Sequence, residues 1–272
     1  MPSIIQLGKY SMAKIFCIAN QKGGVGKTTT TVNLAAGLAK VGQRVLMVDL
    51  DPQGNATMGS GVDKRKLELT VYDVLLESAS VAEARVQSSK LIDADCGYDI
   101  LGANRELAGA EVEMVELERR EKRLKNALAQ VESDYDFILI DCPPSLSMLT
   151  LNGLCCAHGV IVPMQCEYFA LEGLADLVNT IKQVHANLNK ELAIIGLLRV
   201  MFDPRITLQQ QVSEQLKARF ADKVFNTVIP RNVRLAEAPS YGVPGVVFDP
   251  PSKGAQAFLA FAREMVARIE KT

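Results

Sequence analysis

The chain has 272 residues, of which 48% are hydrophobic and 22% are charged, and its formal net charge is −1. This length and composition allow a large buried core and lie at the upper end of what one α/β domain occupies. Met1–Lys14 lacks an apolar segment and a cleavage site, and no apolar run is long enough to span a bilayer. These features argue against a secreted or membrane-spanning protein and predict a cytoplasmic one.

Short apolar runs rich in β-branched residues predict strands at Lys14–Ala19, Arg44–Val48, Tyr98–Leu101, Phe137–Ile140, Gly159–Pro163, Ala193–Val200 and Val224–Ile229. Helical periodicity between them predicts helices at Thr28–Lys40, Arg105–Val131, Leu146–Ala157, Glu172–Leu188, Thr207–Phe220 and Gly254–Ile269. Alternating strands and helices indicate a doubly wound, mostly parallel α/β sheet with helices on both faces. We expect a single domain over residues 12–272, preceded by a flexible N-terminal extension over residues 1–11.

A glycine-rich loop separates the first predicted strand from the first predicted helix. Its residues are Gly23, Gly24, Val25, Gly26, Lys27, Thr28 and Thr29. Backbone N–H groups of such a loop turn toward phosphate oxygens, while Lys27 can neutralise the β- and γ-phosphates and the Thr28 hydroxyl can ligate Mg²⁺. The usual first glycine of this motif is replaced by Gln21, and an additional lysine, Lys22, follows it. A tight turn alone would not require the Lys-Thr pair, so the sequence predicts an ATP site.

Carboxylates follow two other strands at the edge where the loop lies. Asp49 and Asp51 end the second predicted strand, and Asp141 ends the fourth. Asp141 is placed like the acidic residue of the Mg²⁺ shell in P-loop proteins, whereas Asp49 or Asp51 could orient the attacking water. One of these aspartates could instead cap the turn that follows it, but this is a poor explanation for both Asp51 and Asp141, because they share a sheet edge with the loop.

These strings together resemble the deviant Walker ATPases, and most closely the ParA/Soj chromosome- and plasmid-partitioning proteins. The resemblance runs from about Met12 to the C-terminus and includes the late string Ile229–Ser240. It implies that two protomers sandwich ATP and that Lys22 reaches the phosphates bound by the partner. It also implies that Asp51 positions the water and that Thr28, Asp51 and Asp141 surround the Mg²⁺.

The same resemblance implies partners. Family members bind DNA without sequence preference as the ATP dimer, and a ParB-type activator stimulates their weak hydrolysis, which implies a nucleoid-associated protein. Arg205 and Arg234 match the DNA-contacting arginines of the family, and Pro230 and Arg231 occur where its adenine-contacting loop lies. Residues 190–272 carry 12 lysines and arginines against 8 acidic residues, a local charge of +4. Such a segment can hold a polyanion despite the near-neutral chain.

The chain also departs from the family pattern. Residues 1–11 carry no helical DNA-binding module of the kind found in longer plasmid members, so we do not expect binding to a specific operator. The stretch Gly242–Phe248 replaces a segment in which the resemblance implies a lysine, so we expect one basic contact of the family to be absent.

Three other functions would each require a feature that this sequence does not show. A MinD-type division-site regulator needs a strongly basic, membrane-inserting C-terminal helix, but Glu264 and Glu270 offset the cations of Gly254–Thr272. We therefore expect this end to pack against the body, without stable membrane association. A metabolic synthetase would need a polar substrate constellation, which we do not find. The six cysteines lie mostly in apolar stretches and Cys142 stands beside two prolines, which favours reduced, buried thiols over an iron–sulfur cluster.

Overall fold

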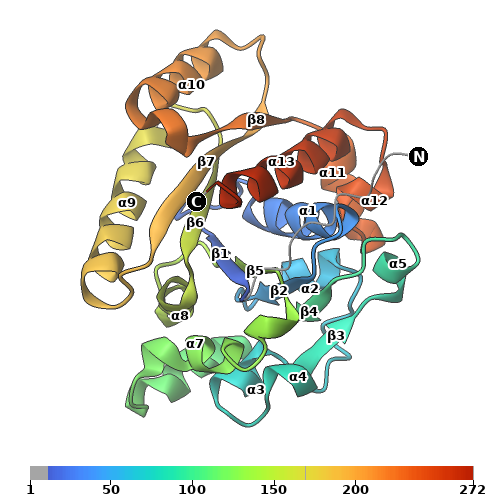
Figure 1. Ribbon diagram of the computed structural model, residues 1–272, viewed down its shortest axis with the longest axis vertical. Helices are drawn as coiled ribbons and strands as arrows, with labels where there is room; N and C mark the ends of the chain where they lie inside the picture. Colours follow the sequence, from blue (N-terminus) through green and yellow to red (C-terminus); the bar gives the residue numbers. More distant parts are fainter. Residues whose placement is uncertain (1–11, 169, 272) are drawn as a thin grey trace.

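The computed structural model describes residues 12–168 and 170–271. Its centre is a sheet of eight strands in the order β3-β4-β2-β5-β1-β6-β7-β8 (Figure 1). Neighbouring strands are parallel except for the antiparallel pair β3 and β4. The strands are β1 (Lys14–Ile18), β2 (Val45–Asp49), β3 (Arg85–Gln87), β4 (Asp99–Leu101), β5 (Phe137–Asp141), β6 (Gly159–Met164), β7 (Ala193–Phe202) and β8 (Val224–Pro230). The doubly wound, mostly parallel sheet predicted from the sequence is confirmed.

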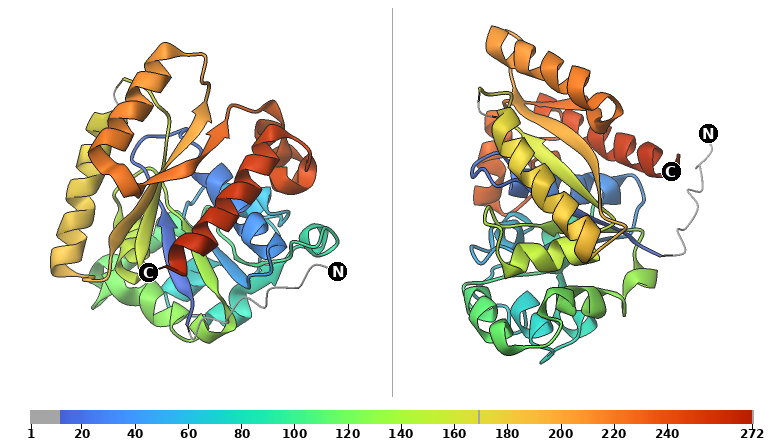
Figure 2. Two further views of the ribbon diagram at one scale, coloured as in Figure 1. Left: turned by 45° about the horizontal axis from the view of Figure 1, so that its top comes forward. Right: turned by 90° about the vertical axis from the view of Figure 1, so that its left-hand side faces the viewer.

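Helices cover both faces of this sheet (Figures 1 and 2). They are α1 (Lys27–Lys40), α2 (Asn55–Gly59), α3 (Val71–Leu75), α4 (Val81–Ala84), α5 (Ser89–Ile92), α6 (Leu107–Glu113), α7 (Arg123–Leu128), α8 (Met148–Cys156), α9 (Ala170–Asn187), α10 (Thr207–Phe220), α11 (Val233–Glu237), α12 (Gly245–Phe248) and α13 (Lys253–Ile269). Short 3₁₀ turns lie at Met114–Glu116, Arg120–Lys122, Glu132–Asp134, Ala221–Lys223 and Ala238–Tyr241.

Alternate side chains of the central strands point to opposite faces of the sheet and pack into two separate hydrophobic cores. In β1, Ile15 and Cys17 join the core beneath α3, α6, α7, α8, α9 and α10, whereas Phe16 and Ile18 join the core beneath α1 and α13. A side chain at Gly37 of α1 would meet the Ala262 Cβ of α13 at 3.0 Å, so these two helices pack closely. Burial on both faces explains why the strands read as continuous apolar runs.

The C-terminal helix α13 packs against the body, as the sequence predicted. Phe258, Phe261 and Met265 of this helix are almost completely buried, whereas Leu259 and Ile269 are partly buried. Over the described ranges, the structure contains no helix with the length and hydropathy needed to cross a membrane.

One expected helix, Arg105–Val131, is wrong. The structure divides it into α6, two 3₁₀ turns and α7, and Arg119 between the turns has a φ of 51°. Leu117 is the one apolar residue from Glu116 to Arg123, so no continuous apolar stripe holds a single helix on the sheet here. The flexible extension expected over residues 1–11 lies outside the described residues.

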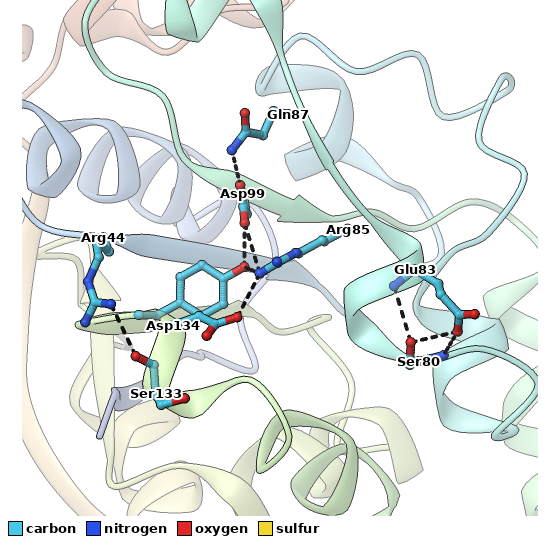
Figure 3. A network of polar contacts seen from close by, with 9 residues as sticks. Arg44, Ser80, Glu83, Arg85, Gln87, Asp99, Ser133 and Asp134 are labelled. Atoms are coloured by element: carbon cyan, nitrogen blue, oxygen red, sulfur yellow. Dashed lines mark hydrogen bonds and ion pairs between the residues drawn. The ribbon is translucent and has the colours of Figure 1, made fainter. Parts of the chain in front are cut away.

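The sequence also gave no sign of the edge strand β3, because three residues with one apolar side chain do not form a recognisable run. Polar contacts hold this strand instead. The Arg85 guanidinium lies 3.4 Å from Asp99 of β4 and 3.3 Å from Asp134 (Figure 3). Side-chain partners from two other segments therefore compensate for the shortness of the strand.

Candidate nucleotide site

The loop between β1 and α1 has the backbone shape that phosphate binding requires. Gly24 and Gly26 have φ values of 72° and 76°, in the left-handed region that favours glycine. The Asn20 carboxamide anchors the start of the loop, because its oxygen accepts from the Lys22 N–H at 3.0 Å and its nitrogen donates to the Pro163 carbonyl at 2.8 Å. The loop is thus held open at the N-terminus of α1, where the helix dipole favours an anion.

Lys27 points back along this loop. Its ammonium donates to the Lys22 carbonyl at 3.2 Å, and the residue is 7% exposed. Burial lowers the pKa of Lys27, and the charge of Asp141 opposes this shift. A largely buried ammonium whose hydrogen bond goes to a main-chain carbonyl is suited to exchange that carbonyl for phosphate oxygens.

Asp141 lies at the end of β5, beside both β1 and β2. Its two carboxylate oxygens accept from the Thr28 and Thr31 hydroxyls, each at 2.8 Å. Burial, followed by the charge of Asp49, raises the pKa of Asp141 to about 7. Carboxylate and hydroxyl oxygens are hard ligands that fit Mg²⁺, so Thr28 and Asp141 could hold this ion directly or through water. Sequence reasoning missed Thr31, although its position one turn after Thr28 in an expected helix was a usable signal.

Asp49, the last residue of β2, and Asp51, two residues beyond it, differ in burial. Asp49 is fully buried and pairs in register with Asp141, and burial raises its pKa to about 6. Its oxygens accept from the Asp51 N–H at 3.1 Å, the Thr57 N–H at 2.8 Å and the Thr57 hydroxyl at 2.7 Å. Asp51 is half-buried, and its carboxylate accepts from the Gln53 N–H at 2.9 Å. Of the two, Asp51 is the one whose carboxylate remains accessible to water.

A cavity of about 300 Å³ extends from the phosphate loop between the ends of β7 and β8. It is bordered by Pro230 and Arg231, together with Gly26, Thr29, Thr30, Val200, Met201, Ile229, Asn232, Val233, Leu235, Ala236 and Phe258. The buried Thr30 hydroxyl has no hydrogen-bond partner among the residues that the structure describes. An apolar cavity with a few polar groups, continuous with a phosphate cradle, can hold the base of a nucleotide.

Comparisons with known proteins agree with this geometry. The AAA domain family model matches residues 13–194. The sporulation initiation inhibitor protein Soj of Bacillus subtilis is 52% identical over 256 residues, which cover 94% of this chain and 99% of Soj. The chromosome partitioning protein ParA of Caulobacter vibrioides is 46% identical and is covered to 94%, as is this chain. The chain belongs to the ParA/Soj family of partitioning ATPases.

Solved structures show the same fold. Cobyrinic acid a,c-diamide synthase of Mycobacterium smegmatis, with bound ADP and magnesium, has a TM-score of 0.82 and 39% identity, with 95% of this chain and 96% of that chain covered. The cell division ATPase MinD of Pyrococcus furiosus has a TM-score of 0.75 and 26% identity, with 96% and 99% covered. Because these neighbours carry different activities on one fold, the site residues must decide among them.

The Lys22 side chain is exposed. Its ammonium pairs with the Glu167 carboxylate from the loop after β6, and both side chains are about half exposed, at 48% and 45%. Sequence reasoning missed Glu167, and the available signal was its position after a strand that ends at the same sheet edge. Because this ion pair lies at the surface, it contributes little free energy and can open readily.

The two arginines matched to the DNA contacts of the ParA/Soj family lie beyond the carboxyl ends of β7 and β8. Arg205 is highly exposed and pairs with Asp203 at 2.7 Å. Arg234, on α11, pairs with Glu237 at 2.9 Å and with Asp249 at 3.3 Å. Because the two strands are parallel neighbours, both guanidinium groups lie beyond one end of the sheet.

We expect Asp141→Asn to stabilise the nucleotide-free, magnesium-free protein at high pH. The pKa of Asp141 is about 7 in the folded state against 3.8 in the unfolded chain, so the folded state binds more protons between these values and stability falls as the pH rises through them. The variant lacks this loss. Its free energy of unfolding relative to wild type should therefore increase by on the order of 2–4 kcal/mol between pH about 4 and about 7 and then stay constant. Urea unfolding across this pH range measures the difference in free energy of unfolding between the variant and wild type. A difference that does not change with pH would contradict the raised pKa of Asp141.

Proposed function

We propose that this partitioning ATPase is switched by ATP between a monomer and a sandwich dimer that binds DNA without sequence preference. Lys22 carries the proposal. Its main chain holds the loop through the Asn20 and Lys27 contacts, whereas its side chain is exposed and tied to the protomer by a surface ion pair. The side chain can therefore leave its own protomer without disturbing the loop, as a contact to a partner's phosphates requires.

Within one protomer, the proposed roles follow the geometry. Lys27 binds the β- and γ-phosphates, the glycine-rich loop supplies N–H donors, and the cavity behind Pro230 and Arg231 holds the adenine. Thr28, Asp51 and Asp141 would hold a Mg²⁺ ion, which would neutralise negative charge on the phosphate oxygens. Asp51 orients the attacking water. A side-chain carboxylate is in general a weak base at neutral pH, so positioning of the water matters more than proton abstraction.

Hydrolysis then resets the switch. A second cation from the partner, Lys22, lowers the repulsion between two triphosphates and stabilises the charge that develops on the leaving group. Loss of the γ-phosphate weakens the attraction between Lys22 and the nucleotide of the partner. The dimer then opens and DNA is released. We propose that a ParB-type activator accelerates this step and that the protein is cytoplasmic and associated with the nucleoid.

A MinD-like membrane cycle is the alternative, and the packing of α13 disfavours it. The residues that such a helix would insert into lipid, Phe258, Phe261 and Met265, form the core above α1. Releasing them would expose three large apolar side chains at a cost of several kcal/mol. No comparable cost opposes DNA binding by Arg205 and Arg234, which are already at the surface.

The test compares retention of a non-specific duplex in ATP and in ADP. With Arg205 and Arg234 from two protomers, about four phosphate contacts give an affinity that falls roughly 100-fold between 50 and 200 mM salt. We expect retention in ATP, loss in ADP and this salt dependence. Anionic vesicles serve as the second arm. Binding to vesicles with no retention of DNA would favour the membrane alternative, and retention of neither would contradict both.

A further inference from the structure

Asp49 is a fully buried carboxylate at the end of β2 that the proposed chemistry does not use. One of its oxygens accepts from the Asp51 N–H at 3.1 Å, and the other accepts from the N–H and the hydroxyl of Thr57 at 2.8 and 2.7 Å. These donors stand two and eight residues further along the chain. The Asp49 side chain therefore ties the main chain at Asp51 to the helix α2.

Thr57 extends this connection to a third segment. While its hydroxyl donates to Asp49, it accepts from the Ala103 N–H at 3.0 Å, just beyond the end of β4. The same hydroxyl thus uses both its donor and its acceptor capacity inside the protein, with the residue 0% exposed. A serine, but not a valine, can reproduce both hydrogen bonds.

The turn between Asp51 and α2 also packs against the main chain at Ala103. A Cβ at Gly54 would come within 2.5 Å of the Ala103 carbonyl, and Gly54 has a φ of 60°. Lys64 donates to the Gln53 carbonyl from outside the turn. The segment that carries Asp51 is therefore braced from β2, from β4 and from the residues that follow α2.

We propose that Thr57, acting through Asp49, is a positioning residue that holds Asp51 in place for hydrolysis. The proposal rests on the proposed water-orienting role of Asp51. Asp51 lies on a short, half-exposed turn. The hydrogen bond from its N–H to Asp49 fixes the main chain there, and this in turn fixes the position of the Asp51 carboxylate. A displacement of about 1 Å in a catalytic group can cost 100-fold in rate. Loss of the Thr57 hydroxyl should consequently slow the chemical step without weakening ATP binding, because the phosphate loop is built from other residues.

The test uses the matched variants Thr57→Val, which keeps the volume and removes the hydroxyl, and Thr57→Ser, which keeps the hydroxyl and removes a methyl group. We measure Mg-ATP hydrolysis in the presence of non-specific duplex DNA, together with ATP-dependent DNA retention. For Thr57→Val we expect kcat to fall about 10- to 100-fold, KM to stay within about threefold and retention to persist. For Thr57→Ser we expect kcat within about threefold of wild type.

A double-variant cycle separates positioning from general destabilisation. If Thr57 acts through Asp51, Thr57→Val should have no further effect on kcat in an Asp51→Ala background. Asp49→Asn, which keeps the volume but loses an acceptor, should reproduce the kcat defect of Thr57→Val and stands in for it should the valine variant not fold.

Three outcomes would overturn the inference. They are a wild-type kcat in both Thr57→Val and Asp49→Asn, an equal loss in Thr57→Ser and Thr57→Val, or a full further effect on top of Asp51→Ala. Failure of the proposed function looks different, because wild-type protein itself would then not hydrolyse ATP or would not retain DNA in ATP.

Discussion

Lys22→Ala is expected to give a monomer that binds ATP, hydrolyses it at least 100-fold more slowly and does not retain DNA. Alanine keeps the two main-chain contacts of residue 22, to Asn20 and Lys27, so the phosphate loop should stay formed. The change removes an exposed ion pair worth at most about 1 kcal/mol, so the fold should also survive. The proposed dimer, however, loses a cation facing each triphosphate, in a water-excluded site where such contacts are strongest.

Light scattering in ATP, with nucleotide binding measured alongside, checks this prediction. Glu167→Gln is the matched control, because it removes the other half of the same surface pair but leaves Lys22 in place. That variant should dimerise as well as wild type or up to several-fold better, since Lys22 no longer has to leave a carboxylate. Undiminished dimerisation of Lys22→Ala, or an equal loss in Glu167→Gln, would argue against a role for Lys22 in the partner's site.

Arg234→Glu should weaken retention of non-specific DNA on the order of 100-fold at low salt. A dimer would lose two phosphate contacts and gain two repulsive carboxylates beside Glu237 and Asp249. The salt dependence should drop as well, by about two units in the slope of log affinity against log salt. ATP binding should be unchanged, because the Arg234 side chain pairs with surface carboxylates and does not contribute to the phosphate loop.

Arg219→Glu is the charge-matched control. Arg219 is exposed near the end of α10, which leads to the start of β8, so it lies at the opposite end of the sheet from Arg234. This variant carries the same change in net charge and should retain DNA at close to the wild-type level. Arg234→Ala removes the guanidinium without adding a carboxylate, so it should show an intermediate loss of DNA retention. This variant controls for local misfolding of α11 in Arg234→Glu. Retention that stays unchanged in Arg234→Glu, or falls equally in Arg219→Glu, would remove Arg234 from the DNA site.

Part of the nucleotide site could be predicted because its residues are contiguous in the chain. Strand, glycine-rich loop and helix follow one another within Lys14–Lys40, and short-range sterics and hydrogen bonds determine their shape. Placing Asp51 and Asp141 beside the loop required one further rule, that parallel strands bring their carboxyl ends to one edge. The expected helix Arg105–Val131 failed where charged residues replace the apolar stripe, because tertiary packing decides helix continuity more than local propensity does.

By itself, the sequence determined the parallel α/β sheet, the phosphate loop and the carboxylates at its edge, since these depend on apolar periodicity and on residues close together in the chain. Only the tertiary structure decided which β2 aspartate is buried, that Glu167 holds Lys22, and that Thr57 joins Asp49 to the end of β4. The partners in these contacts come from different strands and loops. Which donor meets which acceptor at the sheet edge depends on strand order and register, and neither can be read from a local pattern.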